Sequence, residues 1–418
     1  MIHVPPEATL DHCIKCNICV TACPVAAVTD LFPGPKYEGP QAGRFRGASQ
    51  PVVDHSVDYC SGCRVCNQVC PTGVRIAEIN ARARALMVSG GAVSRRLRLR
   101  NNLVARPEAI GRLARPVAPL ANLLLRSRPG RWLGEAVLGL DRRAPLPPYR
   151  LRGFRSWFKR HPRPAGAART VAYFQGCSTE YFEPRVGRAA VAVLEANGFA
   201  VLLPPQNCCG LPLLSNGEFK AAAHYHDSNL AKLVGYIKDG IEIVGTSTSC
   251  TLTLKEEAPE LLGAYGEAAV LVAEHTFDFH EFLRRLRDEG WLAPVVRAVP
   301  LRLAYHQPCQ YRAHRIGSPA TELMGLIPGL EIVESQAACC GIAGTYGYKQ
   351  EKYDIAMAVG APLFDFVDSV GGPLAVCDSE TCRWQITHGT GVPAIHPVEL
   401  LAYAYGAEPE GPLAEVLG

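Results

Sequence analysis

Strand and helix patterns alternate along the last 250 residues of the chain, from residue 169 to residue 418. The β-rich apolar runs "TVAYF" (170–174) and "IEIVG" (241–245) are typical of buried strands. The segments "RVGRAAVAVLEANG" and "FKAAAHYHDSNLAKLVGYIKDG" have helical periodicity and end on Gly198 and Gly240. Strands that alternate with helices predict a mostly parallel sheet, with ligands gathered at the carboxyl ends of its strands.

This pattern occurs twice. "TVAYFQGC" (170–177) aligns with "RLAYHQPC" (302–309), and "FAVLLPPQNCCG" (199–210) aligns with "LEIVESQAACCG" (330–341). "IEIVGTSTSC" (241–250) aligns in turn with "PLAVCDSETC" (373–382). The aligned cysteines are 131 or 132 residues apart, so one α/β unit is used twice. We expect the two units at 169–298 and 299–418, each with its cysteines just after strands.

Residues 94–168 have a different pattern, in which prolines and apolar groups such as "LANLLL" alternate with arginine. Residues 94–163 hold 17 Arg and one Lys against three acidic residues, although the whole chain carries only +4. The prolines predict short helices and linker.

The charge of this segment has three interpretations. It binds an anionic membrane surface, where each basic residue adds about 1 kcal/mol and apolar side chains such as Trp132 and Leu123 to Leu125 add more. Alternatively, it is a solvated linker that wraps the first domain or docks on an acidic partner. Binding of nucleic acid is not expected, because no recognised nucleic-acid-binding fold accompanies the charge.

Residues 1–93 contain two matched cysteine runs, "CIKCNICVTACP" (13–24) and "CSGCRVCNQVCP" (60–71), out of 17 cysteines in the chain. The N-terminal segment "MIHVPPEATLDHC" has neither the basic start nor the apolar core of an export signal. We therefore expect a reducing compartment, where clustered cysteines bind metal more often than they form disulfides. The sequence has no run of 18 or more apolar residues, so no membrane-spanning helix is predicted.

The spacing of the two runs favours a pair of [4Fe–4S] clusters. Cys-x2-Cys-x2-Cys supplies three ligands of one cluster, and the remote fourth cysteine serves the other cluster. Zinc is the alternative, but it prefers separated cysteine pairs, often with histidine, and His12 and His55 lie outside the runs. The predicted ligand sets are Cys13, Cys16, Cys19 and Cys70 for one cluster, and Cys60, Cys63, Cys66 and Cys23 for the other. This cross-ligation brings the clusters close enough for an electron to pass between them. The long linker at 24–59 predicts a helical version of the domain.

The repeated Cys-Cys-Gly motif favours further metal-cluster ligation. The glycines, Gly210 and Gly341, allow the backbone to turn and approach closely. The alternative is that these thiols are small buried apolar groups or a redox-active pair. The candidate ligands are Cys177, Cys208, Cys209 and Cys250 in the first unit, and Cys309, Cys339, Cys340 and Cys382 in the second.

Signatures of substrate chemistry are missing from the sequence. There is no dinucleotide fingerprint after an early strand, no P-loop and no G-x-S-x-G. The glycine-rich "GIAGTYG" (341–347) continues a Cys-Cys-Gly motif and is interpreted as a cluster loop. His306 either tunes a cluster by hydrogen bonding or is structural. We expect a subunit that receives electrons and does not itself oxidise a substrate.

The double Cys-Cys-Gly unit resembles the heterodisulfide-reductase-like iron–sulfur proteins. Together with "CCGIAGTYGYK", "SETCRWQI", "GAPLF" and "PGPK", it makes the chain most similar to the family of C subunits of anaerobic glycerol-3-phosphate dehydrogenases. The resemblance implies an α+β multidomain protein, with a helical two-cluster ferredoxin domain followed by the duplicated α/β region. It also implies transfer of electrons from flavoprotein dehydrogenase subunits to the quinone pool, at the cytoplasmic face of the inner membrane as a peripheral protein.

The sequence departs from the wider family pattern Cys…Cys-Cys-Gly…Cys-x2-Cys. Ser247 and Ser379 stand where the pattern has cysteine, and Cys377 lies two residues before the second of these. Each unit therefore offers four thiols, and we expect one or two further clusters in this region. Three other functions remain open: an autonomous disulfide or quinone reductase, an iron–sulfur subunit of a glycolate- or lactate-oxidising complex, and a redox sensor, for which no DNA-binding element is visible.

Overall fold

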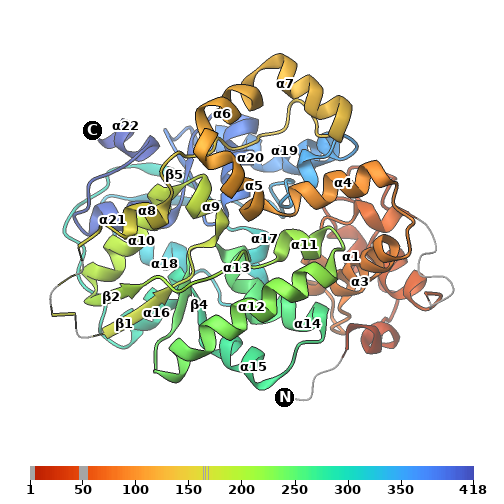
Figure 1. The fold of residues 1–418 in the computed structure, drawn as a ribbon, viewed down its shortest axis with the longest axis horizontal. Coiled ribbons are helices and arrows are strands. Elements are labelled where there is room, and N and C mark those ends of the chain that lie inside the picture. Colours follow the sequence, from red (N-terminus) through yellow and green to blue (C-terminus); the bar gives the residue numbers. More distant parts are fainter. Residues whose placement is uncertain (1–4, 47–54, 163, 165, 168) are drawn as a thin grey trace.

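The computed structural model describes residues 5–46, 55–162, 164, 166–167 and 169–418. Figure 1 shows the N-terminal helical region at one side of the molecule, and the two sheets with their flanking helices at the other. Parts of the predicted ferredoxin domain, residues 1–4 and 47–54, lie outside the described residues, as do Arg163 and the predicted boundary at residue 168. The α+β fold is confirmed.

The N-terminal region consists of short helices joined by loops. Among the described residues before residue 94 there is no strand, which agrees with the helical version predicted from the long linker. Each cysteine run includes one of these short helices: the first run contains α1 and the second contains α2. The elements are η1 (Pro6–His12), α1 (Ile18–Thr21), η2 (Tyr37–Gln41), η3 (Ser56–Tyr59), α2 (Val65–Gln68) and α3 (Ile76–Ser89).

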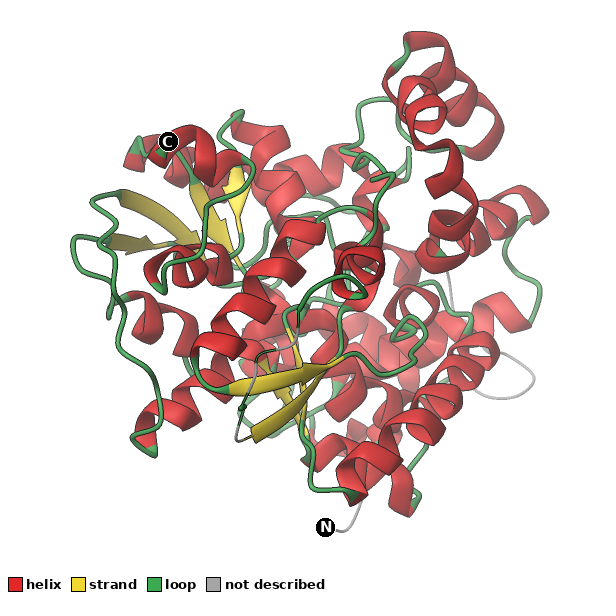
Figure 2. Ribbon diagram, turned by 60° about the vertical axis from the view of Figure 1, so that its left-hand side comes forward, coloured by secondary structure: helices red, strands yellow, loops and turns green. Residues whose placement is uncertain are grey.

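The duplication predicted from the sequence is confirmed by two four-stranded parallel sheets. The strand orders are β2-β1-β3-β4 and β6-β5-β7-β8, so each strand of one sheet has an equivalent in the other. Figure 2 shows the sheets as two separate layers, each flanked by helices. The strands are β1 (Arg169–Tyr173), β2 (Phe199–Leu202), β3 (Ile243–Gly245), β4 (Thr276–Asp278), β5 (Arg302–His306), β6 (Glu331–Glu334), β7 (Ala375–Cys377) and β8 (Ala394–Ile395).

The helices of the first unit follow the predicted pattern. Both helices predicted from periodicity are present, and Gly198 and Gly240, which follow them, have the positive φ typical of helix ends. The elements are α9 (Gly176–Tyr181), α10 (Pro184–Ala196), α11 (Leu211–Ser215), α12 (Phe219–Lys238), α13 (Thr248–Leu252), η6 (Thr253–Glu257), α14 (Ala258–Leu262), α15 (Glu267–Glu274) and α16 (Phe279–Asp288).

The second unit has the same layout with fewer helices between its second and third strands. The segment from Cys339 to Tyr348 remains a loop with a short 3-10 turn, where the first unit forms α11. The elements are α17 (Cys309–Ala313), α18 (Pro319–Met324), η7 (Tyr346–Tyr348), α19 (Tyr353–Val370), α20 (Glu380–Thr390), α21 (Pro397–Ala404) and α22 (Pro412–Leu417).

One apolar core continues through both units, so they are packed as a single body. Val171 and Tyr173 of β1 belong to the same buried cluster as Leu303 and Tyr305 of β5. Parallel sheets covered on both faces bury such near-continuous apolar strands. The cysteine sites at the strand ends are therefore held in a fixed relation to each other.

Matched polar contacts lie within each unit and across the seam between the two. The hydroxyl of Tyr173 bonds to Oγ1 of Thr246 at 2.7 Å, and the hydroxyl of Tyr305 donates to Asp378 at the same distance. Nε2 of His396 lies 3.0 Å from the carbonyl oxygen of Thr246, while Nδ1 of His280 lies 3.0 Å from the Asp378 carboxylate. Each unit thus contacts, at its third strand, a histidine of the other.

The arginine-rich segment is anchored to the fold at its beginning. Arg100 is only 1% exposed and forms a bidentate pair with Glu351, with both N–O distances 2.7 Å. Beyond it, α6 and α7 project from the molecule (Figures 1 and 2). The predicted short helices are α4 (Arg95–Val104), α5 (Pro107–Ala114), η4 (Arg115–Val117), α6 (Ala118–Arg126), α7 (Arg128–Leu133), η5 (Gly134–Leu138) and α8 (Phe154–Phe158).

The two Cys-Cys-Gly glycines offer a matched test of the packing. Both have positive φ, which costs a non-glycine residue about 1–2 kcal/mol. A Cβ on Gly341 would also lie 1.9 Å from the carbonyl oxygen of Ala356, whereas on Gly210 its nearest neighbour is 3.6 Å away. We expect Gly341→Ala to lower the midpoint of thermal unfolding more than Gly210→Ala does, by the equivalent of about 1–3 kcal/mol. Equal losses would contradict the close approach of α19 to this loop.

Candidate functional site

Four cysteines of the N-terminal region line one small cavity near the surface. Cys13, Cys16 and Cys19 come from the first ligand run, and Cys70 comes from the end of the second. Burial raises the pKa of Cys19, and the next causes are the charges of Cys70, Cys13 and Cys16. Cys16 is exposed, so this set, which we call site A, reaches solvent.

The other four cysteines line a second cavity, which we call site B. Cys23 from the first run lies with Cys60, Cys63 and Cys66 of the second run. Burial raises the pKa of Cys23 to about 11, with a smaller contribution from Cys60. The structure therefore brings together the two predicted sets of four cysteines, each with three cysteines from one run and one from the other. Their roles as cluster ligands remain a prediction.

The two ligand loops share an unusual backbone conformation. Residues on both sides of the middle cysteine have positive φ: Lys15 and Asn17 in one loop, Gly62 and Arg64 in the other. Such conformations cost a non-glycine residue about 1–3 kcal/mol and gather at ligand sites. The thiols also accept hydrogen bonds, from the backbone N–H groups of Ala26 on Cys23, of Val74 on Cys70 and from the side chain of Asn80 on Cys60. Pre-shaped loops with N–H groups on sulfur fit a thiolate-bound cluster.

Hydrogen bonds lower the pKa of Cys70, whereas burial raises the pKa values of Cys19 and Cys23. Burial opposes its ionisation, but hydrogen bonds from the hydroxyl and backbone of Thr72 and from Val74 outweigh burial and lower its pKa. A lowered pKa favours the thiolate, the form that binds metal. This agrees with the predicted role of Cys70 as a ligand of site A, although it lies far in sequence from the other three members.

Arg64 fastens the site B loop to the first α/β unit. Its guanidinium lies 2.9 Å from Glu78 and 3.2 Å from Glu257, and two more carboxylates, of Glu260 and Glu256, lie within 3.8 Å. Burial raises the pKa of Glu260 to about 7 and also raises that of Glu257. A buried arginine among four carboxylates fixes position more than it adds stability.

The eight candidate cysteines of the repeat form two equivalent groups. The Cys208 thiol hydrogen bonds with Cys177 and Cys209, and Cys209 bonds in turn with Cys250. The same sequence of contacts links Cys309, Cys339, Cys340 and Cys382. We call these groups site C1 and site C2. The contacts to neighbouring thiols lower the pKa of the first cysteine of each pair, Cys208 and Cys339.

Sites C1 and C2 share one internal cavity of about 160 Å³, and Cys60 and Cys63 of site B also line it. Burial raises the pKa of Cys63, and the charge of Cys339 is the next cause. Cys63 belongs to the same buried cluster as Cys309 and Cys339. Site B therefore borders site C2, and site C2 faces site C1 across the cavity.

The residues at the departures from the family pattern lie beside these sites. Ser247 donates to the Glu380 carboxylate at 3.2 Å, which brings an acidic group of the second unit to the first. Cys377 contacts the Cys382 thiol but does not line the shared cavity. His306 is buried, and neither of its ring nitrogens has a partner among the described residues. Its hydrogen bonding to a cluster stays a prediction.

Several charged groups near site B have almost no signal in the sequence. Nζ of Lys352 lies 2.6 Å from the Asp58 carboxylate, and Nζ of Lys349 lies 2.8 Å from the side chain of Asn216. Both lysines are buried in the cavity wall, and burial lowers the pKa of each. The only local sequence signal is their place directly after the glycine-rich loop 341–347.

The four cysteine groups enclose space and do not converge on a point. Within the described ranges, no three or more Cys, His, Asp and Glu side chains are arranged to hold a single metal ion. Each predicted N-terminal set lines a cavity of its own, and the other two share a larger one. Donor sets of this kind fit a cluster of several irons, which is wider than one ion.

Comparisons with known proteins agree with this arrangement. Residues 9–74 match the family described as a 4Fe-4S dicluster domain, and residues 171–255 and 303–387 each match a cysteine-rich domain. The chain is 38% identical to the C subunit of anaerobic glycerol-3-phosphate dehydrogenase from Escherichia coli (strain K12) over 403 residues, which is 95% of this chain and 99% of that protein.

Two more distant relatives match part of the chain. The B subunit of fumarate reductase (CoM/CoB) from Methanothermobacter marburgensis is 30% identical over 56% of this chain and 46% of its own length. Lactate utilization protein A of Bacillus thuringiensis (strain Al Hakam) is 29% identical over 46% of this chain and 83% of its own length.

Sites A and B each draw cysteines from both runs, and this predicts how pairs of substitutions combine. Cys16→Ser and Cys70→Ser each remove a predicted ligand of site A, so the double variant should lose no more iron than either single variant, about four atoms per chain. Cys16→Ser with Cys63→Ser should lose about eight, because it removes a ligand from both sites. Iron analysis and EPR of anaerobically prepared protein measure this. If the Cys16–Cys70 pair loses twice the iron of either single variant, the cross-ligation is wrong.

Proposed function

The chain belongs to the family of C subunits of anaerobic glycerol-3-phosphate dehydrogenases, and from this premise we propose that it passes electrons from a flavoprotein dehydrogenase to membrane quinone. It is the iron–sulfur electron-transfer subunit of such an enzyme. The eight cysteines of sites A and B hold two [4Fe–4S] clusters, and those of sites C1 and C2 hold further clusters. When bound, these groups supply one-electron steps.

The unbroken series of thiol sites is the observation that carries this proposal. Site A reaches solvent at Cys16, site B borders site A through the shared ligand runs, and site B borders site C2 at Cys63. Site C1 lies across the same cavity. A protein that only accepts and passes electrons needs this continuity, together with an entry at the surface for a flavoprotein partner.

Reduction by the partner tests the proposed donor. With its flavoprotein subunits present and oxygen excluded, addition of glycerol 3-phosphate should reduce the clusters, seen as bleaching of their visible absorption and as new EPR signals. Lactate and glycolate should leave the spectra unchanged. Lack of reduction by glycerol 3-phosphate, or turnover of a disulfide substrate by the chain alone, would overturn the assignment.

The projecting hairpin formed by α6 and α7 is the proposed membrane contact. It presents large apolar side chains to solvent, among them Leu120 and Leu123, each 66% exposed, and Trp132, 59% exposed. Arg126 and Arg128 are exposed on the same hairpin. An apolar patch beside basic residues is typical of helices that lie in the headgroup region of an anionic bilayer.

In the described part of the chain, no helix has both the length and the apolar character needed to cross a bilayer. From its family, the protein is proposed to lie on the cytoplasmic face of the inner membrane.

Substitutions in the hairpin test this contact. Leu120→Ser, Leu123→Ser and Trp132→Ser together should weaken flotation with anionic phospholipid vesicles by at least about tenfold, because the buried apolar area supplies much of the binding energy. The matched control replaces three exposed apolar side chains elsewhere, Trp291, Val296 and Leu326, by serine. Equal loss in the two triple variants, or no loss in the hairpin variant, would reject the assignment of the hairpin.

A further inference from the structure

The two repeated units differ in what covers the outer side of their cysteine sites. Cys177 and Cys208 of site C1 correspond to Cys309 and Cys339 of site C2. On the second unit, this pair of positions packs against Cys63 of site B. On the first unit, the equivalent positions border a separate pocket of about 250 Å³. Site C2 thus meets site B on this side. Among the described residues, site C1 has no cysteine site on the equivalent side and borders the pocket instead.

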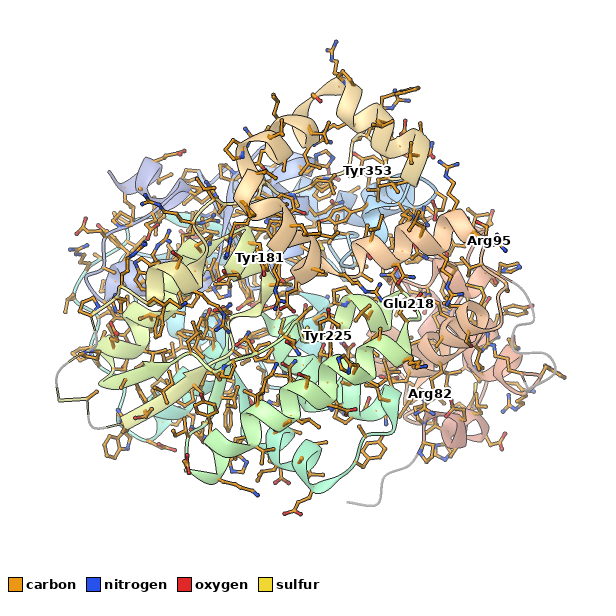
Figure 3. The ribbon with its side chains drawn as sticks, in the orientation of Figure 1. Arg82, Arg95, Tyr181, Glu218, Tyr225 and Tyr353 are labelled. Atoms are coloured by element: carbon orange, nitrogen blue, oxygen red, sulfur yellow. The ribbon has the colours of Figure 1, made fainter. Side chains whose placement is uncertain are left out.

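The arginine-rich segment builds the outer wall of this pocket. Glu108, Arg112 and Arg115 line it from α5 and η4, and Tyr181 lines it from α9. Helix α5 lies tightly on α9, since a Cβ on Gly111 would lie 2.5 Å from the Tyr181 ring. Figure 3 shows Tyr181 on the face of the molecule where α5 passes over α9. The Glu108 carboxylate also accepts the backbone N–H of Cys208, which ties this wall to site C1.

The polar groups of the pocket include an acceptor that lacks a partner. Gln175 is 4% exposed and lines the pocket, and its Oε1 has no hydrogen-bond partner among the described residues. Arg112 and Arg115 supply donors: the first pairs with Glu108 and the second lies 2.6 Å from Glu180. Arginine has more donors than one carboxylate uses. A ligand that accepts hydrogen bonds in one state and donates one in the other suits this set.

Exposed apolar side chains follow the pocket donors along the chain, towards the hairpin. Leu113, 76% exposed, follows Arg112 directly, and the exposed Val117 and Leu120 come next along the chain. The donors that line the pocket and the first apolar side chains of the hairpin thus belong to one continuous segment, 112–120. A ligand with a polar head and a long apolar tail fits this combination.

We propose that this pocket binds the headgroup of an isoprenoid quinone and is where the quinone is reduced, a proposal that rests on the function proposed above. A cluster held by the cysteines of site C1 would supply two electrons, one at a time, and the quinone takes up two protons from solvent at the pocket mouth. Both carbonyl oxygens become hydroxyl groups. Clusters held at sites A, B and C2 would carry these electrons from the flavoprotein donor. Arg112 and Arg115 donate to the carbonyl oxygens, and Oε1 of Gln175 accepts from a hydroxyl of the quinol.

Reoxidation by a short-tailed naphthoquinone tests the pocket without a membrane. In steady-state reoxidation of the reduced full-length chain by 2,3-dimethyl-1,4-naphthoquinone, Arg112→Leu with Arg115→Leu should raise KM at least about tenfold. Arg152→Leu with Arg160→Leu is the matched control: it makes the same charge change at exposed arginines of the same segment, outside the pocket, and should leave KM unchanged. Iron content verifies that the clusters of each variant are intact.

A binding measurement independent of turnover accompanies the kinetics. A photoreactive azido-naphthoquinone should label residues of α5 or of the segment 175–181 in the wild-type chain, and the labelling should fall at least about tenfold in the Arg112–Arg115 variant. Labelling confined to another surface, or an unchanged KM in that variant, would overturn the pocket while the proposed function stands. A different outcome would overturn the proposed donor instead. In that outcome, glycerol 3-phosphate and the flavoprotein do not reduce the chain, but the quinone still reoxidises the reduced chain through the pocket.

Discussion

The position of one ligand loop determines how the rest of the molecule is connected. Arg64, between two cysteines of site B, is buried among four carboxylates, three of which belong to the first α/β unit. Burial of so many charges is costly, so the network holds the loop in one place more than it stabilises the fold. With the loop fixed, Cys63 lies against site C2 of the second unit. The N-terminal domain is thus fastened to one unit and faces the cysteine site of the other.

Duplication supplied two equivalent cysteine sites, and the surroundings make them different. The sheets have the same strand order, and matched tyrosines bond to the residue after the third strand in each unit. Yet the outer side of site C2 is closed by site B, and that of site C1 borders a pocket walled by α5. Two similar sites with different neighbours suit a path for electrons: site C2 lies next to site B, where electrons enter the repeat, and site C1 lies next to the pocket, where they leave it. A single unit would not provide both ends.

Much of this arrangement could be predicted from the sequence, because its signals are local. The repeat follows from the constant offset of its cysteines, and both predicted helices of the first unit end at the expected glycines. The grouping of Cys70 with the first run follows from cluster chemistry, and the structure brings these residues together. The coarse function followed from motifs that cover most of the chain.

The remaining features depend on packing between distant segments and have no local signal. Charge alone suggests that Arg100 is one more exposed arginine, whereas it is buried against Glu351, some 250 residues away in sequence. Which unit faces site B, and the contact between Ser247 and Glu380, likewise arise only once the units are docked. The apolar groups of the arginine-rich segment were visible in the sequence, but their gathering on one hairpin was not.

A continuous electron path requires clusters in the repeat as well as in the N-terminal domain, because a series of sites conducts only if every site is filled. Iron and acid-labile sulfide per chain, determined on anaerobically purified protein, measure this directly. Four occupied sites predict about 16 iron atoms with equal sulfide. A value of about eight irons per chain would contradict the continuous path.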